Sequence, residues 1–187
     1  SFACALDRAG GVWGWGGDWV GQLGDGGPEA SSTRPVQVLD GLSEPLSSVL
    51  SLGGAGQGHA CVQKVDRAMC WGAGGEGRLG TGDLQQGDNA RVVSRSALGV
   101  AFEPVTDVAV GWIHTCLLDG AGAAWCTGNN LWRQLGVAAA EDHVVVPTAV
   151  KGDHEYRSVE SGGEHNCALD YGGIVRCWGR NTSGQLG

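Results

Sequence analysis

The chain has 187 residues, among them 35 glycines, eight tryptophans and seven cysteines, and its formal net charge at pH 7 is −8. This glycine content without a Gly-X-Y period excludes a collagen, and 42% hydrophobic residues argue against a disordered chain. No apolar run approaches the ~18 residues of a membrane-spanning helix, so we expect no membrane insertion. Twelve basic residues against twenty acidic ones disfavour nucleic acid as a partner, because phosphate backbones attract the opposite charge.

The sequence repeats, and the first unit opens at Phe2-Ala3-Cys4-Ala5-Leu6-Asp7 and closes at Gly21-Gln22-Leu23-Gly24. The first cysteine of each unit is residue 4, 61, 116 or 167, which gives periods of 57, 55 and 51 residues. We therefore divide the chain into the units 1–24, 59–80, 114–136 and 165–187, with connecting strands in 25–58, 81–113 and 137–164.

Each period predicts four short β-strands. One alternating segment, such as Val108-Ala109-Val110, precedes a glycine; the His-x-Cys and Cys-Trp-Gly segments form a hairpin, and a fourth strand follows Pro35 or Pro147. Four strands per ~50-residue repeat with glycine-rich turns are typical of a β-propeller blade. The predicted fold class is all-β, with residues 1–187 forming one β-propeller segment.

The cysteines predict the register of the hairpins. Pairing Cys167 with Cys177 leaves a three-residue loop, 171–173, with glycine available for a left-handed position. The shorter spacing of Cys61 and Cys70 leaves Val65-Asp66 at the tip, where a β-branched residue is unfavourable at positive φ, so we expect a wider tip there.

Directly opposed residues of an antiparallel hairpin lie within disulfide range. We therefore expect three disulfides, Cys61–Cys70, Cys116–Cys126 and Cys167–Cys177, which would indicate an oxidising compartment: extracellular, periplasmic or cell surface. The alternative is buried free thiols that pack as small hydrophobic groups. Cys4 has Gly14 at its partner position, so it is expected to be buried and unpaired.

The pattern Gly-x-x-His-x-Cys-x-Leu followed by Cys-Trp-Gly-x-Asn-x-x-Gly-Gln-Leu-Gly, complete in residues 162–187, resembles the regulator-of-chromosome-condensation repeat. The cysteine-bearing hairpins resemble secreted bacterial members of that family, such as the propeller-type β-lactamase inhibitory protein. The resemblance implies a seven-bladed propeller, of which about three and a half blades are present here. It leaves function open, because family members include nucleotide-exchange factors, enzyme inhibitors and interaction modules. Two units depart from the pattern, with Phe2 and Gly14 in the first and Thr127 in the third.

We find no pattern that predicts catalysis, a cofactor or a metal. The pairs His59/Cys61, His114/Cys116 and His165/Cys167 recur in the blades, whereas a metal site needs about four ligands at one place. A structural histidine is the simpler interpretation. Asn181-Thr182-Ser183 is formally a glycosylation sequon, but it lies inside the repeat motif and we read it as a coincidence.

The variable positions of the motif predict a partner-binding rim of loops at one end of the blades. In the third unit, opposed residues sum to 242, which places Ile113 opposite Asn129 and Trp112 opposite Asn130. The same positions in all units give the rim residues Phe2, Trp19, Val20, Gln57, Glu76, Trp112, Ile113, Leu131, Trp132, Glu164 and Thr182. Trp71, Trp178 and the Leu-Gly pairs recur and are expected in the core and turns.

These observations predict a non-enzymatic protein-binding propeller, secreted or surface-exposed, whose partner protein the sequence does not identify. The alternatives are a guanine-nucleotide exchange factor for a small GTPase, and a carbohydrate-binding propeller that stacks sugars on the tryptophans. We further expect the segment to be completed by the rest of a longer propeller chain or by a second copy; a closed four-bladed ring is the alternative.

Overall fold

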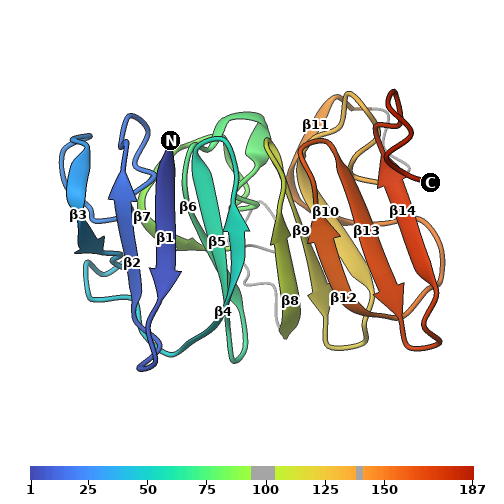
Figure 1. The fold of residues 1–187 in the computed structure, drawn as a ribbon, viewed down its shortest axis with the longest axis horizontal. Coiled ribbons are helices and arrows are strands. Elements are labelled where there is room, and N and C mark those ends of the chain that lie inside the picture. Colours follow the sequence, from blue (N-terminus) through green and yellow to red (C-terminus); the bar gives the residue numbers. More distant parts are fainter. Residues whose placement is uncertain (94–103, 138–140) are drawn as a thin grey trace.

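The computed structural model describes residues 1–93, 104–137 and 141–187 and contains four antiparallel sheets in chain order (Figure 1). The first sheet contains β1 (Phe2–Leu6), β2 (Val12–Gly16) and β3 (Ser32–Gln37). The second contains β4 (Val49–Ala55), β5 (His59–Lys64), β6 (Ala68–Gly72) and β7 (Gly87–Val92), with a short 3₁₀ turn, η1 (Gly75–Gly77), before β7. The third contains β8 (Val105–Val110), β9 (His114–Asp119), β10 (Ala124–Asn129) and β11 (His143–Ala149). The fourth contains β12 (Tyr156–Ser161), β13 (His165–Asp170) and β14 (Val175–Gly179).

Each sheet is one propeller blade in which the strands pair in the order of the chain. The predicted all-β class and the four-stranded repeat are confirmed by the second and third sheets. The first and fourth sheets lie at opposite ends of the row (Figure 1), so these four blades form an open arc rather than a closed four-bladed ring.

The core consists of three apolar clusters, one at each junction between neighbouring blades. Val12, Val62 and Trp71 belong to the cluster between the first and second blades. Leu79 and Leu117 pack between the second and third blades, and the third and fourth blades share a similar cluster. Because strand side chains alternate between two faces, each inner blade buries one face against each neighbour.

The predicted hairpin register is confirmed by direct pairing of the cysteines. Disulfides join Cys61 to Cys70, Cys116 to Cys126 and Cys167 to Cys177, each with a Cα–Cα distance of 4.1 Å. Cys4 lies opposite Gly14, is half-buried and has no disulfide partner. Burial raises the pKa of the Cys4 thiol to about 12.

The hairpin tips follow the sequence in one respect and depart from it in another. In the last hairpin the Asp170 amide donates to the Ile174 carbonyl at 3.0 Å, and Gly173 takes the left-handed position with φ 84°. The wider tip expected at Val65-Asp66 is wrong, because the Lys64 amide donates to the Arg67 carbonyl at 2.8 Å and closes a two-residue loop. Neither tip residue has positive φ, so the β-branched Val65 meets no steric penalty.

We predict that intact-mass measurement of native protein will give a mass six hydrogens below that of the fully reduced chain, since three disulfides are formed. A single thiol, Cys4, should react with iodoacetamide only slowly, because its raised pKa keeps it protonated near neutral pH. Seven reactive thiols in native material would contradict both statements.

Replacing Gly14 by cysteine should create a fourth disulfide with Cys4, because Gly14 and Cys4 are directly paired as the other cysteines are. A Cβ at Gly14 would lie 3.1 Å from the Leu23 carbonyl oxygen, so the loop must move slightly. Closing this short loop should raise the free energy of unfolding by at most about 2–3 kcal/mol. The melting temperature of Gly14→Cys with and without reductant measures the gain; an unchanged value, with the bond formed, would mean that displacement of Leu23 offsets it.

Candidate functional site

All of the predicted rim residues are at least partly accessible. They lie at one end of the blades, in loops except for Phe2, which begins β1, and Glu76, which lies in η1. The exposed large hydrophobic side chains among them are Trp19 (65%), Leu131 (62%), Trp112 (49%) and Trp132 (43%). Phe2 differs from the other predicted rim residues, because it is half-buried and packs against the core cluster between the first and second blades. We call this end of the blades the loop rim.

In three of the four blades, two side chains of the repeat motif hold the backbone of the loop that follows the Cys-Trp-Gly strand or its equivalent, which we call the exit loop. The Asn130 side-chain oxygen accepts the Leu135 amide at 3.2 Å, and the Gln134 side-chain oxygen accepts the Trp132 amide at 2.8 Å. The same two bonds recur in the first and fourth blades, from Asp18 and Gln22 and from Asn181 and Gln185. The variable side chains therefore project from a rigid backbone. In the fourth blade the Leu186 amide donates to the side-chain oxygen of Asn181, so the asparagine of the Asn181-Thr182-Ser183 sequon has a structural role.

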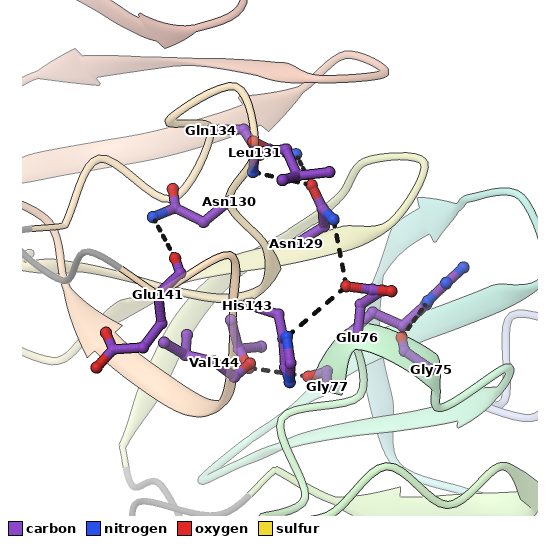
Figure 2. Close-up of polar contacts among 12 residues, drawn as sticks. Gly75, Glu76, Gly77, Asn129, Asn130, Leu131, Gln134, Glu141, His143 and Val144 are labelled. Carbon is purple, nitrogen blue, oxygen red and sulfur yellow. Dashed lines mark hydrogen bonds and ion pairs between the residues drawn. The ribbon is translucent and has the colours of Figure 1, made fainter.

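The second blade lacks both of these side chains and forms its exit differently. Gly74 and Arg78 replace the residues that correspond to Asn130 and Gln134. The loop instead forms the 3₁₀ turn η1, in which Glu76 has a left-handed conformation with φ 63°. Figure 2 shows the Glu76 carboxylate directed at the third blade. It accepts a hydrogen bond from the side-chain nitrogen Nδ2 of Asn129 at 3.3 Å and lies 3.9 Å from His143 Nδ1. Glu76 thus joins the rim of the second blade to that of the third.

Trp112 lies where the rims of the third and fourth blades meet. Its amide donates to the Gly163 carbonyl at 3.0 Å, and a Cβ at Gly163 would lie 2.8 Å from the indole. The indole ring therefore occupies the space that a side chain at position 163 would need, while Trp112 remains about half exposed to solvent. The predicted pairing of Ile113 with Asn129 is confirmed by a hydrogen bond of 2.9 Å from the Asn129 amide to the Ile113 carbonyl. The pairing of β9 with β10 is not observed as far as Trp112 and Asn130, whose amides donate to other segments.

The Trp132 ring packs against the guanidinium group of Arg180, in the fourth blade. The guanidinium carbon of Arg180 lies 4.7 Å from the centre of the Trp132 ring. Arg180 is itself held by an ion pair with Glu164 and by a bond from Nε to the Thr182 hydroxyl at 2.8 Å. Trp132, Glu164 and Thr182, which the sequence placed on the rim, are thereby brought together by a residue that the sequence analysis did not single out.

At the other end of the arc, Trp19 borders a groove of about 550 Å³ between the first and second blades. Its lining includes Val20 and Gln57, both predicted rim residues.

Among the described residues, no group of three or more histidine, cysteine or acidic side chains could hold a metal ion. Nor does any helix in the described ranges have the length and hydrophobicity to cross a bilayer.

Comparison with known proteins identifies the repeat. The family model of the regulator of chromosome condensation (RCC1) repeat matches residues 156–185. The ultraviolet-B receptor UVR8 of Arabidopsis thaliana is 31% identical over 190 residues, covering 100% of this chain and 41% of the receptor. Residues 156–185 are an RCC1 repeat, and the other units of the chain share its pattern.

Further matches agree on the fold. The secretion-regulating guanine nucleotide exchange factor of Bos taurus is 28% identical over 176 residues, covering 94% of this chain and 36% of that protein. The crystal structure of yeast RCC1 (Prp20) with Kap60 bound superposes with a TM-score of 0.76 at 20% identity, over 96% of this chain and 42% of that one. The chain spans less than half the length of each of these proteins.

Two of the three motif histidines, His59 and His114, link neighbouring blades, which agrees with the structural role expected for them. His114 Nε2 lies 2.9 Å from the Asn166 side-chain oxygen, and His59 Nε2 lies 3.0 Å from the Thr115 hydroxyl. Each histidine thus contacts the variable residue of the His-x-Cys motif in the next blade. The glycine of Gly-x-x-His is needed for space: a Cβ at Gly111 would lie 2.0 Å from His114 Cε1.

A second link between RCC1 repeats joins each exit loop to the next blade. The indole of Trp71 donates to the Gln22 carbonyl at 3.0 Å, and that of Trp178 donates to the Gln134 carbonyl at 3.0 Å. In the third blade, where Thr127 replaces the tryptophan, the Thr115 hydroxyl donates to the Arg78 carbonyl at 2.7 Å instead. The carbonyl that precedes each of these Leu-Gly pairs is therefore bonded from the following blade.

We predict that the stability of the RCC1 repeats falls as the pH decreases from 6.5 towards about 4. Burial lowers the pKa of His59 from 6.5 to about 3 and that of His114 to about 4. In this window the unfolded chain binds protons that the folded chain does not, so protonation favours unfolding, and the loss is complete only below the folded-state pKa values. Melting temperatures across this range measure the effect.

The variant His114→Gln should flatten this pH dependence, because it removes one of the two buried histidines. If the melting temperature falls equally steeply with decreasing pH in the wild type and in His114→Gln, the pH dependence does not come from His114.

Proposed function

We propose that the chain is a protein-binding module that engages its partner through the loop rim and catalyses no reaction. The observation that carries the proposal is the exposure of Trp19, Trp112 and Trp132 on loops whose repeat does not require them. Trp71 and Trp178, which the repeat does use, are buried or half-buried and bonded to the preceding blade. Exposed aromatic side chains on a rigid scaffold are typical centres of protein interfaces.

We infer that the module works in an oxidising compartment: outside the cell, in the periplasm or on the cell surface. Three disulfides, each closed within one hairpin, support this location, because the cytosol keeps most thiols reduced. The similarity to yeast RCC1, solved with Kap60 bound, supports the use of this fold for protein recognition and leaves the partner of this chain open.

The alternative function is nucleotide exchange on a small GTPase, which the name of the bovine relative favours. A release assay with a fluorescent guanine nucleotide and a panel of small GTPases separates the two. Accelerated release would favour the exchange factor; partner binding without it would favour the interaction module.

The rim is tested by Trp112→Ala and Trp132→Ala, each measured against a partner captured from the native environment and identified by mass spectrometry. Each change should weaken binding by about 2 kcal/mol or more, because truncation removes a large anchor, and should change the melting temperature little. Tyr171→Ala is the matched control, since Tyr171 is 71% exposed at the tip of the last hairpin, on the opposite end of the blade.

Unchanged affinity in both tryptophan variants would overturn the rim proposal. So would a large drop in melting temperature that accounts for the loss of binding, because the tryptophans would then be structural.

A further inference from the structure

Neighbouring blades are joined on the loop rim by a recurring pair of side chains, which we call the rim pair. One member stands four residues after the glycine of Cys-Trp-Gly or its equivalent, and the other directly follows that glycine in the next blade. Between the third and fourth blades the pair is Trp132 and Arg180, with the guanidinium carbon 4.7 Å from the ring centre. Between the second and third blades it is Glu76 and Asn129, which are joined by a hydrogen bond of 3.3 Å (Figure 2).

The rim pair of the first and second blades, Val20 and Ala73, has two small apolar side chains. Gly58, at the position of Glu164 in the fourth blade, adds no side chain. A Cβ at Gly58 would lie 3.4 Å from Val20 Cγ2 and 3.5 Å from Ala73 Cβ, so the three residues are neighbours. Val20 and Gly58 line the groove of about 550 Å³ at this junction. The groove therefore lies where, between the third and fourth blades, the side chain of Arg180 crosses the rim.

An aromatic ring forms one side of this groove. Trp19 is 65% exposed and lines the groove together with the uncharged side chains of Gln22 and Gln57. A Cβ at Gly17 would lie 3.1 Å from the Trp19 ring, so the indole packs on backbone that has no side chain. The rest of the ring is accessible. The face of an indole attracts a cation, and arginine stacks on such a face more often than lysine does.

Acidic groups gather at the base of the same exit loop. Asp18, which directly precedes Trp19, is only 1% exposed. Burial raises the pKa of Asp18, and the negative charges of Asp25, Asp88 and Glu29 raise it further. Within the described ranges, none of these four carboxylates forms an ion pair. A cation that enters the groove from a partner is therefore attracted by charges that the chain itself does not neutralise.

We propose that the groove between the first and second blades binds an arginine side chain of a partner protein, in the way that the rim between the third and fourth blades holds Arg180. The guanidinium stacks on the Trp19 indole, and the methylene groups pack on Val20. The fourth blade supplies its own arginine, whereas Ala73 leaves this place to the partner. The groove thus selects a basic segment and orients it on the rim. This inference rests on the proposed function and specifies which side chain the rim recognises.

The variant Ala73→Arg tests the groove, because it places an arginine at the position of Arg180 and directs it over Val20. Random peptides displayed on phage are selected on the wild-type chain after depletion on Ala73→Arg. The recovered peptides should share an arginine. Synthetic versions should bind Ala73→Arg and Trp19→Ala about tenfold or more weakly than the wild type. Exchanging the arginine for citrulline, which has nearly the same shape without the charge, should weaken binding to the wild type by a similar factor.

The matched control is Ala73→Ser, which leaves the groove open and should bind the peptides as the wild type does. The citrulline comparison uses the wild-type chain, so it decides the question even if Ala73→Arg is less stable. Failure to recover peptides, peptides without a shared arginine, or equal affinity for the citrulline peptide would overturn the inference. If the native partner loses affinity for Trp112→Ala and Trp132→Ala but not for Ala73→Arg, the rim proposal stands and only the role of the groove fails.

Discussion

The arrangement of the blades depends on one kind of hydrogen bond: a donor from each following blade to the carbonyl that precedes the Leu-Gly pair. Trp71 reaches Gln22, Thr115 reaches Arg78, and Asn166 and Trp178 both reach Gln134. A carbonyl buried at a blade junction would be costly without a donor. The bonds therefore fix the height of each exit loop relative to the next blade, and with it the alignment of the loops that form the rim.

The third blade shows that this bond, rather than the tryptophan that usually provides it, is what the fold requires. The Thr127 hydroxyl does not bond to the Arg78 carbonyl. It lies instead within hydrogen-bond distance of the carbonyls of Gly77, in the preceding blade, and of Val144, in its own blade. Thr115, in the adjacent strand, supplies the donor to Arg78. A sequence that loses the repeat residue at one position thus satisfies the same acceptor from another.

Much of the fold was predictable because periodicity and paired cysteines report local geometry. Opposed cysteines fix the hairpin register to the residue, and the observed pairing of Cys116 with Cys126 extends correctly as far as Ile113 and Asn129. Contacts between blades were not predictable in the same way, since they join residues more than thirty positions apart. The turn of Trp112 onto Gly163 and the position of Arg180 over Trp132 are of this kind. Arg133 is an arginine at a position where the other three units have glycine, and its left-handed backbone, φ 61°, is known only from the structure.

The disulfides have a consequence for how such a chain changes in length. Every one closes within a single hairpin, with a sequence separation of nine or ten residues, and none connects two blades. A duplication or deletion of one whole repeat therefore adds or removes both cysteines of a pair and leaves every other pair intact. Cys4 illustrates the contrasting case, in which a difference inside a repeat, Gly14 in place of the second cysteine, leaves an odd thiol. Covalent bonds confined in this way let the number of blades vary without reshuffling the pairing of the others.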